Sequence, residues 1–271
     1  MSSKTKVMMF VTVIVVSLSV TAIAFILIKP CEYCGDKFCF GTCIIDKGDQ
    51  ANGTTRKKPN KIKTNQTGTR LSSTDRADKS YLDNVVFIGD SRTVALKLHA
   101  GLKDENVFAE EGLNHEDALT KRVVPIQAYK NVSIPDAVKA TAPDIMIVNF
   151  GINGIAWMNI DTFIESYETF IDALIESSPN SIIVIEAVLP VSLSYEQRSD
   201  GVSNEKIDEA NDALFQMAKD KGLYYLGTDE VLKDEGNDLV SGYSSDGLHF
   251  NKQAYDVIVD YILTHAINQK K

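Results

Sequence analysis

The segment Asn84-Val85-Val86-Phe87-Ile88-Gly89-Asp90-Ser91 joins a short apolar run to a glycine, an aspartate and a serine. Such a run, closed by a glycine, is typical of a strand that is buried on both faces. Much later in the chain, Asp246-Gly247-Leu248-His249 lies in a polar loop ahead of an amphipathic helix. A serine after a strand and a histidine ahead of the last helix meet only through the fold. Proteins usually pair a nucleophile with its general base in this way.

Apolar runs alternate with helical patterns from this first strand to the C-terminus. The predicted strands are 84–89, 106–110, 144–150, 181–188 and 223–227. The predicted helices are 93–102, 134–141, 161–176 (with Asp161 as its N-cap), 204–221 and 251–267. This alternation predicts an α/β domain with a mainly parallel five-stranded sheet and right-handed crossovers. The ligand crevice of such a sheet lies at the carboxyl ends of its strands. The residues that follow the first three strands are Ser91, Gly112, Gly151 and Asn153.

His249 is the histidine best placed to act as a base. Asp246 precedes it by three residues in a loop, so one carboxylate can accept a hydrogen bond from the imidazole and fix its tautomer. The other three histidines are His99 and His265, on predicted helices, and His115, a candidate for the rim of the site after the second strand.

Attack by a serine on an acyl carbonyl builds an oxyanion. Its stabilisation needs hydrogen-bond donors that are held in place beforehand, each worth about 3–4 kcal/mol. A backbone N–H at Gly112 and the side-chain amide of Asn153 are placed to supply such donors.

Four short blocks, in this order, resemble the SGNH/GDSL hydrolase superfamily. The blocks are Gly89-Asp90-Ser91, Glu111-Gly112-Leu113, Gly151-Ile152-Asn153-Gly154 and Asp246-Gly247-Leu248-His249. The resemblance covers 81–271 and implies a three-layer α/β/α flavodoxin-like sandwich. It implies that Ser91 is the nucleophile, that His249 is the general base and then the acid, and that Asp246 orients His249. It also implies an oxyanion hole formed by the N–H groups of Ser91 and Gly112 and the side chain of Asn153.

The sequence departs from this family pattern at two positions. Arg92 replaces the leucine of the G-D-S-L signature, and Gly154 replaces the usual aspartate of the G-x-N-D block. Neither change removes a reacting group. We expect Arg92 either to pair with a neighbouring carboxylate or to contact an anionic group of the substrate. We expect Asp90 to be structural, because one carboxylate already serves His249.

Each member of the serine–histidine pair also has a simpler interpretation. Ser91 could cap the helix that follows it, and His249 could be an ordinary loop histidine. The domain could accordingly be a non-catalytic surface-binding module that retains a hydrolase fold.

Composition and charge restrict the partners that we expect. The 271-residue chain has 44% hydrophobic residues and a net charge of −9. Residues 81–271 contain 15 Lys and Arg against 31 Asp and Glu. We expect no nucleic-acid partner, because phosphate contacts require Lys and Arg. We also expect no cofactor, because the sequence has neither a nucleotide-binding loop nor a metal-binding histidine pair.

A charge-free apolar run, 7–28, follows a short N-terminal tail, 1–6. As a helix it would be roughly 33 Å long, which suits a hydrocarbon core of about 30 Å. A cleaved signal peptide is the alternative, but the run is longer than a usual signal core and no small-x-small cleavage site follows it. We therefore expect a single-pass anchor in the cell membrane. The short tail and the long C-terminal domain favour an extracytoplasmic catalytic domain.

All four cysteines fall in a juxtamembrane segment, 29–43. They are Cys31, Cys34, Cys39 and Cys43. Outside the cytosol they could form two disulfides, or four thiolates could hold a structural zinc ion. Palmitoylation and intermolecular bridges are further options. The next segment, 44–80, is basic and poor in apolar residues, so we expect a flexible linker before the hydrolase domain at 81–271.

The expected activity is that of a membrane-anchored serine esterase that cleaves an O-acyl ester through an acyl-enzyme on Ser91. The substrate would be a small acyl ester or an acylated glycan, such as O-acetyl groups on a cell-surface glycan. Transfer of the acyl group to a sugar hydroxyl is a close variant. The segments 113–143 and 190–203 should shape the pocket, and their few aromatic residues favour a short acyl group.

Overall fold

The structure, a computed structural model, describes residues 57–60, 62–127, 130–198 and 201–268. The predictions for the tail 1–6, the membrane helix 7–28 and the cysteine segment 29–43 therefore lie outside the described residues. Within the described ranges, no helix combines the length and the apolar character needed to cross a membrane.

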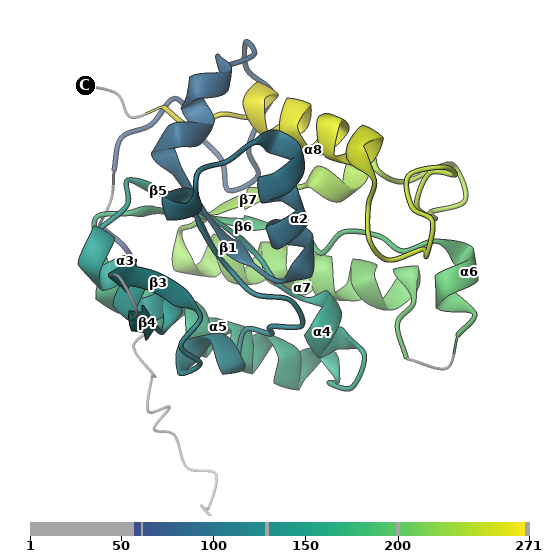
Figure 1. The fold of residues 1–271 in the computed structure, drawn as a ribbon, viewed down its shortest axis with the longest axis horizontal. Helices are drawn as coiled ribbons and strands as arrows, with labels where there is room; N and C mark the ends of the chain where they lie inside the picture. The colour runs from purple at the N-terminus through teal and green to yellow at the C-terminus, as the bar shows by residue number, and fades with distance from the viewer. Residues whose placement is uncertain (1–56, 61, 128–129, 199–200, 269–271) are drawn as a thin grey trace, which may run out of the picture. The chain divides into compact units, whose positions relative to one another are not determined.

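A parallel five-stranded sheet forms the centre of the described domain (Figure 1). Its strands are β1 (Val85–Gly89), β2 (Val107–Ala109), β5 (Ile145–Asn149), β6 (Ile182–Glu186) and β7 (Tyr224–Leu226). Their order is β2-β1-β5-β6-β7, and every neighbouring pair is parallel. All five predicted strands are confirmed. The order corresponds to the flavodoxin-like arrangement, in which the first strand lies beside both the second and the third.

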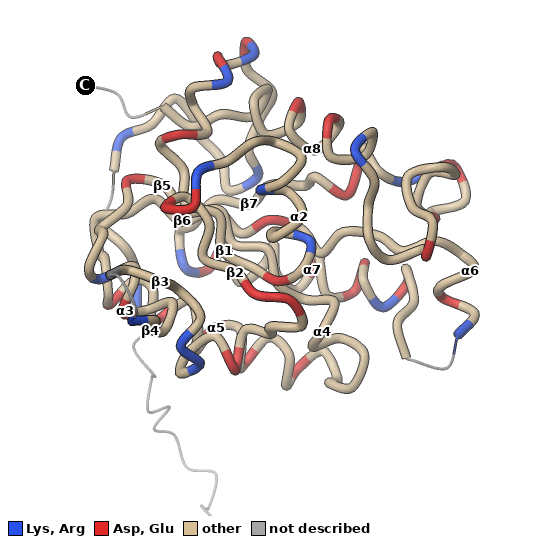
Figure 2. The backbone as a smooth tube through the Cα atoms, in the orientation of Figure 1, with Lys and Arg blue, Asp and Glu red and all other residues tan. Residues whose placement is uncertain are grey.

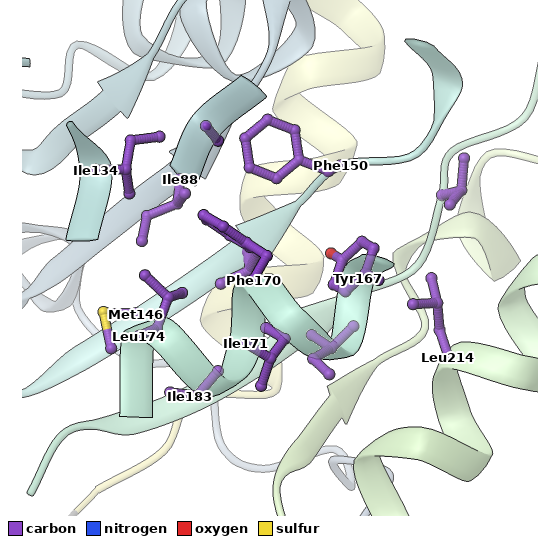
Figure 3. Packing of buried hydrophobic residues seen from close by; sticks show 14 of the residues in the cluster. Ile88, Ile134, Met146, Phe150, Tyr167, Phe170, Ile171, Leu174, Ile183 and Leu214 are labelled. Atoms are coloured by element: carbon purple, nitrogen blue, oxygen red, sulfur yellow. The ribbon is translucent and has the colours of Figure 1, made fainter. Parts of the chain in front are cut away.

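Alternate residues of the strands pack into two separate apolar layers. On one face, Ile88, Met146 and Ile183 lie against helices α3 (Ile134–Thr141), α5 (Ile160–Ser177) and α7 (Asn204–Lys221). Figure 3 shows Phe170, Ile171 and Leu174 of α5 pointing towards these strand residues. On the other face, the alternate strand positions pack against α2 (Ser91–Ala100) and α8 (Lys252–Thr264). This confirms the predicted three-layer α/β/α architecture, since strands covered on both faces read as continuous apolar runs.

The structure corrects the predicted start of α5. The N-cap of α5 is Asn159, not Asp161: its backbone is extended and its side chain accepts a hydrogen bond from the N–H of Thr162 at 2.9 Å. Asp161 lies instead in the first turn of α5, where a carboxylate interacts favourably with the helix dipole.

The connections contain several short elements. A small antiparallel hairpin, β3 (Val124–Gln127) and β4 (Lys130–Val132), lies inside the 113–143 segment and was not predicted. The remaining short elements are η1 (Lys79–Asn84), η2 (Asp104–Asn106), η3 (Asp117–Leu119), α4 (Ile152–Ile155), α6 (Leu193–Glu196) and η4 (Thr228–Val231).

The described part of the predicted linker packs against the domain, so the prediction of a flexible segment is wrong for residues 62–80. Leu71 is buried in the layer that contains α8. Its N–H donates to the carbonyl of Tyr225 at 2.9 Å, and the N–H of Tyr225 donates to the carbonyl of Thr69 at 2.8 Å. The side chain of Gln66 exchanges two hydrogen bonds with the backbone of Ser72. Backbone pairing and packed side chains such as Leu71 and Ile62 therefore order a segment whose composition suggested a linker.

This correction can be tested at Leu71. We expect Leu71→Ala to lower the free energy of unfolding by about 2–3 kcal/mol, because it leaves a cavity in the layer beneath the segment. Ser73→Ala, at an exposed position of the same segment, is the control and should change stability little. Chemical denaturation of the three proteins measures the difference. Equal stability of all three would mean that the segment does not contribute to the folded domain.

Candidate active site

Ser91 is the first residue of α2 and follows the end of β1 by two residues. The turn between them is tight at Gly89, where a Cβ atom would lie 2.1 Å from Thr93 Oγ1 and 2.4 Å from the backbone oxygen of Asn149. The helix is capped by Asp90, whose side chain accepts a hydrogen bond from the N–H of Arg92 at 3.0 Å. Ser91 is thus not the N-cap, and the simple capping interpretation of this serine is wrong.

The fold brings Ser91, His249 and Asp246 together. Ser91 Oγ lies 3.4 Å from His249 Nε2, and His249 Nδ1 lies 2.8 Å from Asp246 Oδ2. The other carboxylate oxygen of Asp246 accepts hydrogen bonds from the N–H groups of Leu248 and His249, both at 2.8 Å. The short loop between the aspartate and the histidine therefore wraps around the carboxylate and fixes the imidazole relative to it.

The charge of Asp246 determines which ring nitrogen of His249 carries a proton. Partial burial by itself would raise the pKa of Asp246. The hydrogen bonds from the His249 ring, from the N–H groups of residues 249 and 248 and from the Ser244 hydroxyl nevertheless hold this pKa well below its usual range. A carboxylate can only accept hydrogen bonds, so Nδ1 carries the proton in the neutral ring. The lone pair of Nε2 then faces Ser91.

Asn153 links the loops that follow three strands. Its Nδ2 atom donates to Asp90 Oδ2 at 3.2 Å and to the carbonyl of Leu113 at 3.1 Å. Gly112 directly precedes Leu113 in the loop after β2, so both predicted oxyanion donors lie at the strand ends near Ser91. Their role as donors stays a prediction. Asp90 is structural in this arrangement: it caps α2 and holds Asn153, and burial raises the pKa of its carboxyl to about 6.

Within the described residues, Arg92 forms no ion pair with a carboxylate, and its contact with an anionic group of the substrate stays a prediction. Its guanidinium is buried and donates to backbone carbonyls of two loops. The bonds run from Nε and Nη2 to Leu248 at 3.2 and 3.1 Å, from Nη1 to Leu189 at 2.6 Å and from Nη2 to Pro190 at 3.1 Å. The guanidinium also lies 4.6 Å from the centre of the Phe250 ring. Arg92 therefore ties the nucleophile helix to the residue immediately before His249.

The glycine at position 154 is explained by His115. A Cβ atom on Gly154 would lie 3.1 Å from His115 Cε1 and 3.3 Å from Phe163, so the space for a larger side chain is already filled. His115 is buried rather than on the rim as predicted, and its Nε2 lies 2.6 Å from Ser166 Oγ. Burial lowers its pKa to about 4, so the ring is neutral. His115 therefore packs against Gly154, in the turn that carries Asn153.

The remaining histidines stand apart from this arrangement. His99 stacks on Tyr255, with ring centres 4.9 Å apart, and His265 stacks on Tyr261. Within the described ranges, no group of three or more His, Cys, Asp or Glu side chains is arranged to hold a metal ion.

One of the segments predicted to shape the pocket lies on the histidine loop. The N–H of Ser192 donates to the carbonyl of Gly247 at 3.0 Å, and the guanidinium of Arg198 donates to the carbonyl of Asp246 at 2.8 Å. The guanidinium of Arg198 also lies 4.8 Å from the centre of the Tyr195 ring. Residues 192–198 of this segment thus contact the loop that carries His249.

Glu186 is a buried carboxyl at the end of β6 that sequence reasoning missed. It accepts a hydrogen bond from Thr228 Oγ1 at 2.7 Å. Burial raises its pKa to about 7, against a smaller lowering by Thr228 and Asn149. Its sequence signal is a single acidic residue that ends an apolar strand.

Glu186 should make the folded state less stable as the pH rises. Its pKa is higher in the folded chain than in the unfolded chain, so the folded state binds more protons between pH 4.5 and 7. Its contribution to stability is present below the unfolded pKa and is lost as the pH rises through about 7, by up to about 3 kcal/mol. Glu186→Gln keeps an acceptor for Thr228 and should flatten this pH dependence, while Glu165→Gln, at an exposed position of α5, should not. Denaturation at pH 5 and pH 8 measures the slope. The proposal fails if Glu186→Gln has the wild-type slope.

Comparison with known proteins places this geometry in a family. The pattern of the GDSL-like Lipase/Acylhydrolase family matches residues 87–257, a range that contains Ser91, Gly112, Asn153 and the Asp246–His249 block. No curated protein sequence matches the chain.

Three solved structures share the fold at low sequence identity. The first, described as a putative platelet activating factor from Streptococcus pneumonia, is 22% identical over 66% of this chain and 81% of that chain, with a TM-score of 0.53. A putative acylhydrolase from Bacteroides fragilis is 18% identical over 77% and 88%, with a TM-score of 0.52. A GDSL-like lipase from Bacteroides thetaiotaomicron is 17% identical over 70% and 89%, also with a TM-score of 0.52. Together with the family match over more than half of the sequence, the residue blocks around Ser91 and His249 show that the chain belongs to the GDSL-like lipase/acylhydrolase family of esterase- and lipase-type hydrolases.

Proposed function

We propose that Ser91 forms an acyl-enzyme with an O-acyl ester and that His249 moves the protons. The Ser91–His249–Asp246 chain of contacts supports this proposal most directly. The 3.4 Å separation of Oγ and Nε2 is long for a hydrogen bond, and such contacts commonly shorten when substrate binds. We propose no cofactor, because the three side chains suffice for acyl transfer.

In the first half-reaction, Ser91 Oγ bonds to the acyl carbon while its proton passes to His249 Nε2. The carbonyl oxygen takes the electron pair of its π bond and becomes an oxyanion. When the carbonyl reforms, the alcohol leaves with the proton from His249, and the acyl group stays on Ser91. Water or a sugar hydroxyl then attacks the acyl carbon, gives its proton to His249 and releases Ser91, which recovers that proton.

The oxyanion would be stabilised by the N–H groups of Ser91 and Gly112 and by the Asn153 amide. The Ser91 N–H belongs to the first turn of α2, where the helix dipole favours negative charge. Asn153 already donates to Asp90 and Leu113, so it would share one of these N–H groups with the oxyanion. Its two protein contacts keep the amide oriented before substrate arrives.

We propose O-acetyl groups of a cell-surface glycan as the substrate. The few aromatic residues in the 113–143 and 190–203 segments favour a short acyl group over a long one. The charge-free run 7–28 supports a membrane anchor, with the catalytic domain on the extracytoplasmic side. A tethered enzyme of this kind would act on polymers close to the membrane.

The serine and the histidine can be tested separately. A fluorophosphonate probe should label the full-length protein, and Ser91→Ala should abolish labelling, because the probe reacts with an activated serine. His249→Ala should lower kcat on 4-nitrophenyl acetate by several orders of magnitude and Asp246→Ala by less. His99→Ala, which alters a histidine stacked on Tyr255, is the matched control. A folded protein that neither reacts with the probe nor hydrolyses short esters would be a surface-binding module instead. Equal rates for wild type and His249→Ala would exclude His249 as the base.

Arg92 gives an independent test of how the base is positioned. Replacing it by the leucine common in the family, Arg92→Leu, removes the donors to Leu248 and lets the loop before His249 move. Because a displacement of about 1 Å can cost on the order of a hundredfold in rate, we expect kcat to fall by about tenfold to hundredfold. The change in KM should be smaller. Arg92→Lys keeps one donor group and should recover part of the loss. Arg122→Leu, at an exposed position, serves as control. If kcat is unchanged in folded Arg92→Leu, Arg92 does not position His249.

A further inference from the structure

Trp157 combines high exposure with a fixed position beside the site. Its relative exposure is 62%, while most large apolar side chains in the described ranges are buried. It is also the only tryptophan among the 271 residues of the sequence. An exposed apolar side chain alone needs no explanation, so its orientation and surroundings decide whether it has a role.

The indole is held by the same turn that carries Asn153. Its Nε1 donates to the carbonyl of Asn153 at 2.8 Å. The backbone N–H groups of Trp157 and Met158 both donate to the carbonyl of Gly154, at 3.2 and 3.0 Å. The one polar atom of the ring is therefore satisfied by protein, and the exposed part of the ring is its apolar surface.

A chain of contacts places this ring at the rim of the Ser91 site. Asn153 binds Trp157 through its carbonyl and Asp90 through its amide, and Asp90 is the neighbour of Ser91. Trp157 lies just after α4, the short helix that follows β5 (Figure 1). A group attached to the ester bound at Ser91 can therefore reach the indole on the side of Asn153.

We infer that Trp157 is a stacking platform for a pyranose ring of the glycan that carries the ester. This inference rests on the proposed esterase function and specifies the alcohol part of its substrate. One face of a pyranose presents C–H groups that pack on an aromatic ring, while its edge presents hydroxyls. The neighbours of Trp157 suit that edge, since Asn153 and Asn159 are amides four and two residues away in the sequence.

Two other ligands fit the surface less well. A long acyl chain needs a continuous apolar lining, and the residues around Trp157 in the sequence include polar amides. A quaternary ammonium group is usually bound by a cage of several aromatic rings, whereas the ring contacts described for the domain do not include Trp157. A single flat ring with its polar atom satisfied suits a sugar.

Fluorescence can report on this ring directly, because the chain has one tryptophan. We expect partly O-acetylated xylotetraose to change the tryptophan emission of full-length Ser91→Ala in a saturable way. Calorimetry should show binding to Ser91→Ala/Trp157→Ala weakened about tenfold or more, and Ser91→Ala/Trp157→Phe, which keeps a ring, should lose less. Ser91→Ala/Leu98→Ala removes another exposed apolar side chain, on α2, and should bind as Ser91→Ala does. Emission that does not respond, or saturation by acetylcholine in place of the oligosaccharide, would overturn the inference.

Turnover separates this inference from the proposed function. In the catalytically intact protein, the ratio of kcat/KM for the acetylated oligosaccharide to kcat/KM for 4-nitrophenyl acetate should fall about tenfold in Trp157→Ala. Any disturbance of Asn153 affects both substrates and cancels in the ratio. Wild-type turnover of both esters with an unchanged ratio would exclude the platform and leave the esterase function intact. Absence of all turnover would exclude the esterase, while the fluorescence titration would still decide whether Trp157 binds sugar.

Discussion

The close packing of Gly89 against Thr93 and Asn149 is the constraint on which the site depends. It lets the chain leave the sheet sharply and begin α2 without an intervening loop. Ser91 is consequently held by a strand on one side and a helix on the other, and neither can shift alone. The carboxyl ends of β2 and β5 flank that of β1, so the loops with Gly112 and Asn153 reach the same place. Rigid elements rather than loop conformations thus set the nucleophile's position.

Electrostatics complete the arrangement through ionisable side chains that have defined partners. Arg92 is buried, yet its guanidinium meets carbonyl oxygens from two loops and the face of Phe250. A planar, weakly hydrated cation tolerates such surroundings better than an ammonium group would. Asp246 is kept charged by hydrogen bonds, whereas Asp90 and Glu186 are pushed towards their neutral forms by burial. Other Asp and Glu residues of the domain lie on α5, α7 and α8 and in the segment between α7 and α8 (Figure 2).

The sequence predicted those parts of the protein whose signal is local. The five strands were visible as apolar runs, and the serine and histidine blocks as short motifs in sheet order. The role of Arg92 could not be predicted, because its partners are backbone carbonyls. Every residue has such a carbonyl, so the sequence does not show which ones Arg92 contacts. The fit of Gly154 to His115 joins two positions that only the fold brings together. Asn159 and Asp161 are both good capping residues, and the sequence alone does not show that Asn159 is the N-cap of α5. The β3–β4 hairpin was not predicted, because a proline such as Pro125 disfavours a strand.

The pairing of residues 69–71 with Tyr225 has a consequence for how the domain behaves in a crowded solution. β7 is the last strand of its sheet, and its free backbone groups would offer a template for a strand from another molecule. The preceding segment occupies part of that template. A chain shortened at residue 81 would expose this edge and should self-associate through β7.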